Sequence, residues 1–211
     1  MKKTLLFTFI LLLSVSLLGC ANGGNPPQPA ENTPPTEGPQ QETVSLKDFF
    51  PLSKGSTWKY LGEGNEYASF NRKVLFVEGD RAQTVEDNGG TVSASIFKTT
   101  ENEIIRTFFQ GEESNETNLL DQKPNDTLVI LKAPLSVGTK WEVQEGVREI
   151  VEIDAIVDTP AGKFEGCIKV SIKMQNSTMN EYFKAGVGMV KREFTSEGMV
   201  VTSTLEKYDI K

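Results

Sequence analysis

The stretch from Phe164 to Met174 reads FEGCIKVSIKM, and apolar and polar residues alternate along it. Successive side chains of a β-strand point to opposite faces of the sheet, so this pattern predicts a strand with one packed face and one wet face. The predicted packed face contains Phe164, Gly166, Ile168, Val170, Ile172 and Met174. The predicted wet face contains Glu165, Cys167, Lys169, Ser171 and Lys173.

Similar segments surround this strand on both sides. Residues 147–157 repeat the alternation through Val151, Ile153, Ala155 and Val157. Further candidate strands are residues 67–77, 91–98, 104–109, 127–131, 181–184, 189–194 and 199–208. Turn-forming Gly, Asn, Asp and Pro residues separate them, and only residues 45–50 predict a helix, of at most two turns, capped by Ser45. The pattern predicts an all-β fold over residues 45–211, as twisted antiparallel sheets in an open barrel or a sandwich.

A pattern of the form PLxxGxxW occurs twice, at Pro51–Trp58 and at Pro134–Trp141, and it includes both tryptophans of the chain. Proline fixes φ, glycine adopts backbone angles that other residues resist, and the tryptophan ring is expected to be buried at the start of a strand. We interpret each copy as the start of a set of strands, which gives two related halves. In the alternative, Trp58 and Trp141 line a site for a sugar or an aromatic ligand.

The first nineteen residues have the features of an export signal. Lys2 and Lys3 precede an apolar run from Leu5 to Leu18, which is shorter than the roughly 20 residues that comfortably span a bilayer. Residues 17–20, Leu-Leu-Gly-Cys, resemble the bacterial lipobox. The resemblance implies that Cys20 becomes the lipidated N-terminus after cleavage, so that acyl chains hold the protein at the outer face of the cell membrane.

Residues 20–44 are expected to form a tether. Six of the ten prolines lie between Ala21 and Val44, among Gly, Asn, Gln, Glu and Thr residues. A segment with so few apolar residues cannot offset its ordering entropy by burial. We predict a disordered spacer between the lipid and the β-rich body, in preference to a proline-rich ligand for a partner domain.

Three motifs of the body together resemble a group of poorly characterised bacterial surface lipoproteins. These are the repeated PLxxGxxW pattern, the segment PAGKF at residues 160–164 and the segment AGVGMVK at residues 185–191. The resemblance implies a secreted β-domain over roughly residues 49–207. It carries no agreed activity and no catalytic residues.

The charge balance and the missing residue types exclude several classes of function. Loss of Lys2 and Lys3 with the signal leaves 20 basic against 29 acidic residues, a net charge of -9, which disfavours nucleic-acid binding. The chain has no histidine, so Ser-His-Asp and Cys-His hydrolysis are excluded. If Cys20 is lipidated, Cys167 is left without a cysteine partner. We expect no cofactor and no metal.

Four further features are candidate sites, and we interpret three of them as structural. Cys167 is a candidate reactive thiol, Gly186-Val187-Gly188 a candidate phosphate loop, and Gly111–Asn118 a candidate calcium loop. Carboxylate pairs suited to glycoside hydrolysis are Glu149 with Glu152 and Asp154 with Asp158. We predict a small covered residue, a hairpin turn and a solvated loop for the first three, and nothing in the sequence places either carboxylate pair in a cleft.

The sequence therefore favours a non-enzymatic binding or scaffolding module of the cell envelope, with an envelope protein, a glycan or a lipid as its partner. The alternative is a carrier or sensor of an apolar ligand, such as a lipid, held in a concave sheet. Three aromatic pairs are candidates for lining that concave side, although a core position is favoured for them. The pairs are Phe49 with Phe50, Phe108 with Phe109, and Tyr182 with Phe183.

Overall fold

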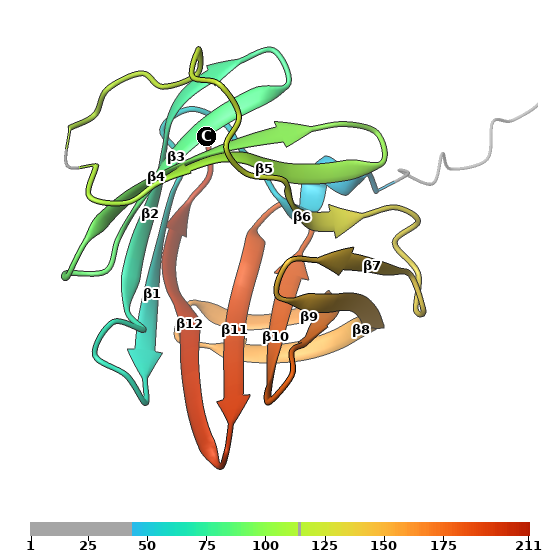
Figure 1. The fold of residues 1–211 in the computed structure, drawn as a ribbon. Helices are drawn as coiled ribbons and strands as arrows, with labels where there is room; N and C mark the ends of the chain where they lie inside the picture. The colour runs from blue at the N-terminus through green and yellow to red at the C-terminus, as the bar shows by residue number, and fades with distance from the viewer. Residues whose placement is uncertain (1–43, 114) are drawn as a thin grey trace, which may run out of the picture. The chain divides into compact units, whose positions relative to one another are not determined.

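In the computed structural model, which describes residues 44–113 and 115–211, twelve strands form one antiparallel sheet (Figure 1). The strands are β1 (Thr57–Glu63), β2 (Phe70–Glu78), β3 (Arg81–Asp87), β4 (Val92–Thr99), β5 (Glu103–Gln110), β6 (Leu128–Lys132), β7 (Lys140–Val143), β8 (Gly146–Thr159), β9 (Gly162–Lys173), β10 (Ser177–Lys184), β11 (Gly188–Ser196) and β12 (Met199–Asp209). A single 3-10 helix, η1 (Leu46–Phe49), precedes them. The all-β, antiparallel prediction is confirmed.

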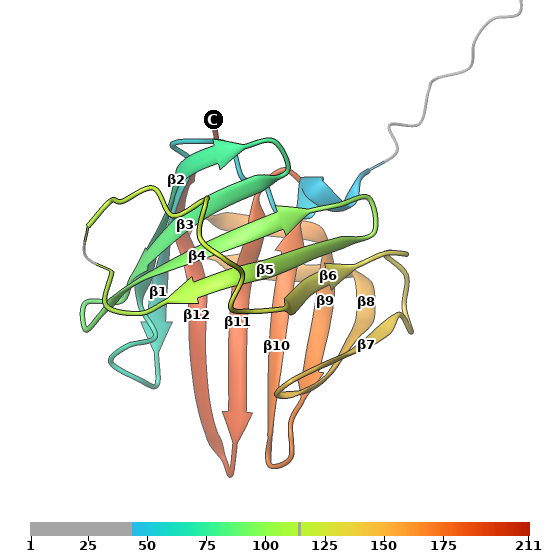
Figure 2. The same cartoon turned by 45° about the horizontal axis from the view of Figure 1, so that its top comes forward.

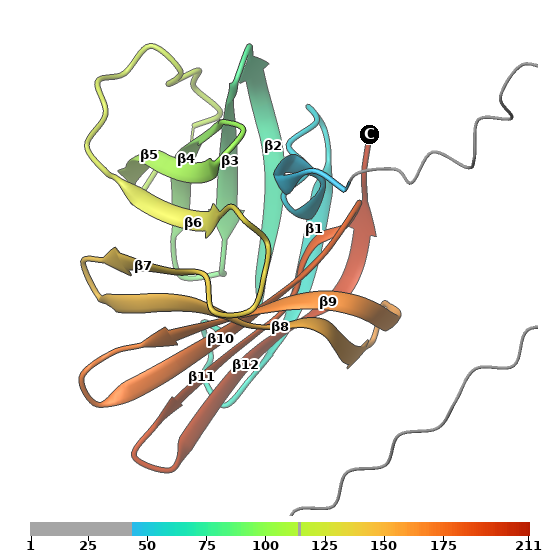
Figure 3. The same cartoon turned by 90° about the vertical axis from the view of Figure 1, so that its right-hand side faces the viewer.

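The strand order is β6-β5-β4-β3-β2-β1-β12-β11-β10-β9-β8-β7. Each half of the chain is thus a six-stranded meander, and the two meanders are joined in the middle of the sheet, where β1 pairs with β12. The sheet curls so that its two edges, β6 and β7, approach each other in an incompletely closed barrel (Figures 2 and 3). The unit from Glu42 to Lys211 contains all twelve strands and both hydrophobic clusters, so it has its own core.

The seam between the sheet edges is bridged by side chains. The Trp141 indole Nε1 donates a hydrogen bond to the Val129 carbonyl of β6 at 3.0 Å. Arg148 of β8 donates from a terminal guanidinium nitrogen to the Ile130 carbonyl at 2.8 Å. Strand β6 is at the edge of the sheet and has a strand partner on one side only. The two side-chain bonds satisfy carbonyls of β6 that could otherwise stay unpaired.

The repeated motif forms the same structure in each half. Gly55 and Gly138 both adopt left-handed backbone angles, with φ of +88° and +91°. The Gly55 N–H donates to the Val74 carbonyl and the Gly138 N–H to the Ile150 carbonyl, both at 2.9 Å. Each turn thereby joins the start of one strand to a fully buried residue of the next strand. The sequence repeat is a structural repeat.

Both tryptophans of the motif are buried structural residues. Trp58 donates its indole N–H to the Val187 carbonyl at 2.7 Å, and Trp141 donates to Val129. Val187 lies in the Gly186-Val187-Gly188 segment, which is the turn between β10 and β11. This placement supports the framing role of the repeat rather than a ligand site between two tryptophan rings.

Two predicted strands differ from the structure in which residues they bury. Cys167 is fully buried instead of wet, because Gly166 has a left-handed φ of +66° in the middle of β9 and shifts the alternation by one residue. In β8 the register shifts twice between Ile150 and Ala155. As a result Ile150 is buried while Ile153 is exposed, against the prediction.

Strand β3 was not predicted, because two of its three buried residues, Gln83 and Thr84, are polar. Gln83 is buried, and its amide bonds both ways with the backbone of the β5–β6 loop: Nε2 donates to the Thr117 carbonyl, and Oε1 accepts from the Leu119 N–H. That loop covers a second, smaller hydrophobic cluster on the outer side of the sheet, formed by Ala94, Ile96, Phe108, Leu119 and Leu120. Within the described part of the chain, no helix has the length and apolarity needed to span a membrane.

Candidate functional site

The concave side of the curled sheet contains a partly open cavity of about 290 Å³. Its lining comes from Phe50, which directly follows η1, and from strands of both halves of the sheet. The apolar lining includes Phe50, Phe97, Phe109, Leu128, Ile130, Ile172, Met174, Met179, Phe183 and Met189. The charged lining consists of Arg72, Arg106, Arg148, Arg192, Glu86, Glu145 and Glu181. Four arginines in a largely apolar interior make this the candidate site, because charged residues are rarely buried without a specific reason.

Two of the arginines occupy equivalent places in the two halves. Arg72 of β2 pairs with Trp58 in the sheet register, and Arg148 of β8 pairs with Trp141. Cross-strand partners lie on the same face of a sheet, so each buried arginine is placed next to a motif tryptophan. Their side chains are 8% and 6% exposed.

Arg72 is held in an ion pair with Glu86 of β3. Its Nε donates to Glu86 Oε1 at 2.8 Å, and a terminal nitrogen lies 2.6 Å from the same oxygen. The rings of Phe50, Tyr60 and Phe70 lie about the guanidinium, with centroids 5.8, 6.0 and 5.8 Å away. Burial opposes ionisation of both partners, but Glu86 raises the pKa of Arg72, and Arg72 with Arg192 lowers the pKa of Glu86.

Glu181 of β10 is shared by two arginines. Arg192 of β11 donates from Nε to Glu181 Oε1 at 3.1 Å, and a terminal nitrogen of Arg148 lies 3.2 Å from Oε2. Burial again disfavours the charged carboxylate, yet the charges of Arg148 and Arg192 outweigh it and lower the pKa of Glu181. The network therefore stays ionised at neutral pH.

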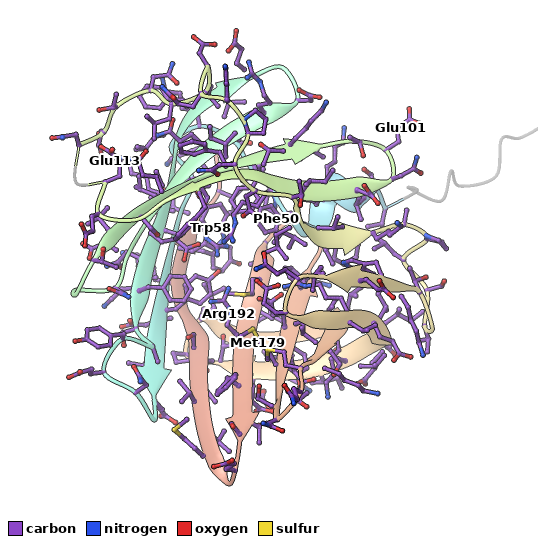
Figure 4. All side chains as sticks on the ribbon, in the orientation of Figure 1. Phe50, Trp58, Glu101, Glu113, Met179 and Arg192 are labelled. Atoms are coloured by element: carbon purple, nitrogen blue, oxygen red, sulfur yellow. The ribbon has the colours of Figure 1, made fainter. Side chains whose placement is uncertain are left out.

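The network leaves hydrogen-bonding capacity unused. Within the described residues, Arg148 Nε and Glu181 Oε2 are buried without a hydrogen-bond partner. The 3.2 Å approach of Arg148 to Oε2 is thus an ion pair without hydrogen-bond geometry. In the described part of the chain, Arg192 makes its one hydrogen bond from Nε. Its guanidinium carbon lies 5.7 Å from the centroid of the Phe70 ring, and its side chain is 32% exposed. Figure 4 shows Arg192 and Met179 in the interior, enclosed by the sheet.

The aromatic pairs contribute to the core and to the cavity lining, and Phe50 and Phe183 belong to both. Phe50, Phe109 and Phe183 line the cavity, one from each pair. Their neighbours Phe49 and Phe108 are buried in the two hydrophobic clusters. Phe50 also packs on Phe97, with ring centroids 4.9 Å apart, so the residue that follows η1 contributes to one wall.

A second hollow of about 360 Å³ lies beside η1, against the β2–β3 turn and the β10–β11 turn. It is more open than the interior cavity. Its charged residues are Lys47, Asp48, Asp80 and Arg81, and none of them is buried. We therefore consider the interior cavity the better candidate site.

The other candidate site residues from the sequence do not line the cavity. Burial raises the pKa of the Cys167 thiol to about 11, which opposes a reactive thiolate. Neither Glu149 with Glu152 nor Asp154 with Asp158 lines the cavity. Glu149 instead forms ion pairs with Lys140 and Lys173 on the sheet surface.

The glycine segment and the acidic loop have structural roles. Gly186 and Gly188 have φ of +76° and +93° in a hairpin turn. In the loop 111–118, Glu116 forms an exposed ion pair with Lys73. The described residues contain no group of three or more His, Cys, Asp or Glu side chains placed to hold a metal ion.

Cys20, the export signal at residues 1–19 and nearly all of the tether at residues 20–44 lie outside the described residues. Their roles stay predictions from the sequence.

The arginine network was not predicted from the sequence, although one signal was present. Arg72 alternates with Phe70 and Val74, and Arg148 shares the parity of Ile150. Both neighbours of Arg72, and Ile150, are buried. A charged residue on the apolar face of an alternating strand is the pattern that predicts a buried, paired charge.

Comparison with known proteins finds one family model and two similar solved structures. The model of a family described as DUF3108-like matches residues 87–205, which is more than half of the chain. No curated protein matches the sequence. A Bacteroides fragilis protein described as exported, with a YmcC-like fold, is similar at 14% identity and a TM-score of 0.49. A Parabacteroides distasonis protein described as a lipoprotein is similar at 14% identity and 0.46. Each match covers 76% of this chain and 98% of the other.

Proposed function

The chain belongs to the DUF3108-like family, and on this premise we propose that it is a cell-envelope lipoprotein whose β-domain binds a small ligand inside the curled sheet without catalysing a reaction. The observation that carries the proposal is the partly open cavity inside the sheet, whose lining combines apolar walls with paired charged groups. This combination is typical of small-molecule sites, and the volume lies at the small end of their range.

Binding is favoured over catalysis by the chemistry of the cavity. The chain has no histidine, and the buried carboxylates of Glu86 and Glu181 have lowered pKa values. A carboxylate that stays ionised and bound to arginine at neutral pH is a poor general acid or base, because proton transfer works best with a pKa near the working pH. Positioning and charge recognition are the roles that these groups can fill.

Attachment to the outer face of the cell membrane is supported by the sequence. The signal-like segment, the lipobox resemblance at Cys20 and the proline-rich residues after it form a continuous series. Two or three acyl chains would hold the protein firmly, and the tether would separate the domain from the lipid headgroups. We infer that the cavity samples small molecules of the envelope close to that membrane.

The anchor is tested by feeding labelled palmitate to cells that produce the full chain. We expect the label in the native protein and its absence in Cys20→Ala, which should also leave the membrane fraction. An unlabelled native protein, or a Cys20→Ala protein that stays equally membrane-bound, would contradict the anchor.

The cavity is tested with 1-N-phenylnaphthylamine, a neutral apolar probe whose fluorescence rises when it leaves water. We expect saturable binding to the unit 42–211, and its loss in Met179→Trp, which fills the cavity from one wall. The matched control is Met199→Trp, since Met199 is exposed on β12 and does not line the cavity. Equal loss in both variants, or no binding to the unaltered domain, would contradict an interior site.

A further inference from the structure

We propose that the cavity selects a monoanionic amphiphile, a molecule with one carboxylate and an apolar chain or ring, and that Arg192 binds the carboxylate. The inference rests on the proposed binding function and names the chemical class of its ligand. It is carried by the balance of charges inside the sheet, by the unused donors of the arginines and by the apolar residues around Arg192.

The buried and half-buried charges of the site do not balance. Four guanidiniums, those of Arg72, Arg106, Arg148 and Arg192, line the cavity. Three carboxylates pair with them: Glu86 with Arg72, Asp126 with Arg106, and Glu181 with both Arg148 and Arg192. The cavity wall therefore has one surplus positive charge. Glu145 is the other acid of the lining, but it is exposed at the β7–β8 turn, where solvent and salt screen it.

The surplus charge is centred on the arginines that share Glu181. A single carboxylate serves both, and Arg148 Nε is buried without a hydrogen-bond partner in the described residues. Glu181 accepts a hydrogen bond from the Nε of Arg192 and not from its two terminal nitrogens. A guanidinium with two free nitrogens presents a planar fork that matches a carboxylate in a bidentate pair. A ligand carboxylate at Arg192 would neutralise the surplus charge.

The rest of the lining fits an apolar group next to that carboxylate. Met179 and Met189 come from the strands around Arg192, and Phe183 and Ile172 extend the same wall. Phe50 contributes from the position that follows η1. Methionine adapts its shape readily to different apolar partners, and burial of each methylene favours binding by about 0.8 kcal/mol. One charged anchor and an adaptable apolar wall together select an amphiphile over a simple anion.

The test is calorimetric titration of the unit 42–211 with three probes: laurate, dodecanol and acetate. Laurate and dodecanol share a tail and differ in charge, whereas acetate carries the charge without the tail. We expect laurate to bind at least about tenfold more tightly than dodecanol, as a charge-assisted hydrogen bond implies, and acetate to bind too weakly to measure. Equal affinities for laurate and dodecanol would overturn the inference and leave the proposed binding function standing. Failure of laurate, dodecanol and the neutral fluorescent probe alike would overturn both.

The variant Arg192→Met tests whether Arg192 is the residue that binds the ligand carboxylate. We expect this variant to lose the preference for laurate while binding dodecanol as the unaltered domain does, which also reports that it is folded. The matched control is Lys191→Met, which removes a positive charge from the adjacent position on the other face of β11. Retained laurate preference in Arg192→Met, or equal loss in Lys191→Met, contradicts the role of Arg192. If Arg192→Met does not fold, Arg192→Lys replaces it, with a weakened laurate preference expected from the loss of the bidentate fork.

Discussion

Arg72 and Arg148 occupy equivalent positions in the two halves of the sheet, each directly across a strand pair from the tryptophan of its own PLxxGxxW motif. The motif glycine of each half bonds to the residue two positions beyond the arginine, Val74 or Ile150. The repeat therefore fixes two arginines inside the sheet as well as two turns. Their carboxylate partners come from different strands, Glu86 from β3 and Glu181 from β10, so the two halves share a frame and differ in their charge networks.

Glu181→Gln should destabilise the domain by roughly 3–5 kcal/mol, because it leaves two buried or half-buried arginines without their shared carboxylate. The measurement is urea unfolding followed by tryptophan fluorescence. Glu193→Gln is the matched control on the neighbouring strand. Its ion pair with Lys191 is much more exposed than Glu181, and its loss should cost under about 1 kcal/mol. Equal effects of the two substitutions would show that the interior network does not contribute to stability.

Acid should weaken the domain through Glu86 and Glu181. Both pKa values are lowered from the ordinary value of 4.5, since the arginine charges outweigh the effect of burial. A carboxyl whose pKa is lower in the folded state contributes its full stabilisation above pH 4.5 and loses it as the pH falls through the lower, folded value. We expect the urea midpoint to hold from pH 7 to about 5 and to fall below 4.5, and to fall less steeply in Glu86→Gln. A midpoint that rises below pH 4.5 would be incompatible with these ion pairs.

Cys167 should resist alkylation in the folded domain. Its thiol is fully buried, and burial raises its pKa to about 11, so little reactive thiolate exists at pH 8. Iodoacetamide followed by mass measurement should modify Cys167 only when urea unfolds the chain. A cysteine introduced by Glu165→Cys, two residues away at an exposed position, should react at once. Rapid modification of Cys167 in the native domain would mean that this part of β9 opens readily.

Gly55→Ala and Gly138→Ala should each destabilise the domain by about 1–2 kcal/mol, the cost of a left-handed backbone for a residue with a Cβ. Both positions leave room for the added atom: the nearest contact at Gly55 is 3.7 Å, and at Gly138 nothing lies within 4 Å. Gly111→Ala is the control, as it also has open space and is not among the glycines with positive φ. Similar losses at Gly55 and Gly138, with none at Gly111, are the expected result of urea unfolding. A clear loss at one motif glycine only would contradict the equivalence of the two turns.

Much of the fold follows from the sequence because alternation and turn residues act locally. The strand at residues 164–174 and the two motif turns are of this kind. The errors arose where a single residue changes the local geometry. Gly166 and the bulges of β8 shift the alternation. Strand β3 buries Gln83, whose amide depends for its hydrogen bonds on a loop more than thirty residues away.

The cavity was less accessible to sequence reasoning than the strands. One aromatic residue from each of the weighed pairs lines it, which the sequence raised as an alternative to a core position. The pairing of Glu181 with Arg148 and Arg192 depends on strand order and on the curl of the sheet. Strand order is a long-range property that single-strand patterns do not encode.

The central claim is that the interior of the sheet is the binding site, and amide chemical shifts of the unit 42–211 test it most directly. On titration with 1-N-phenylnaphthylamine, we expect the largest shift changes at the amides of Met179, Phe183 and Arg192, which line the cavity. Amides near Ile156 and Val200, exposed apolar residues elsewhere on the domain, should be unaffected. Changes centred on Ile156 or Val200, or no changes at saturating probe, would contradict the account.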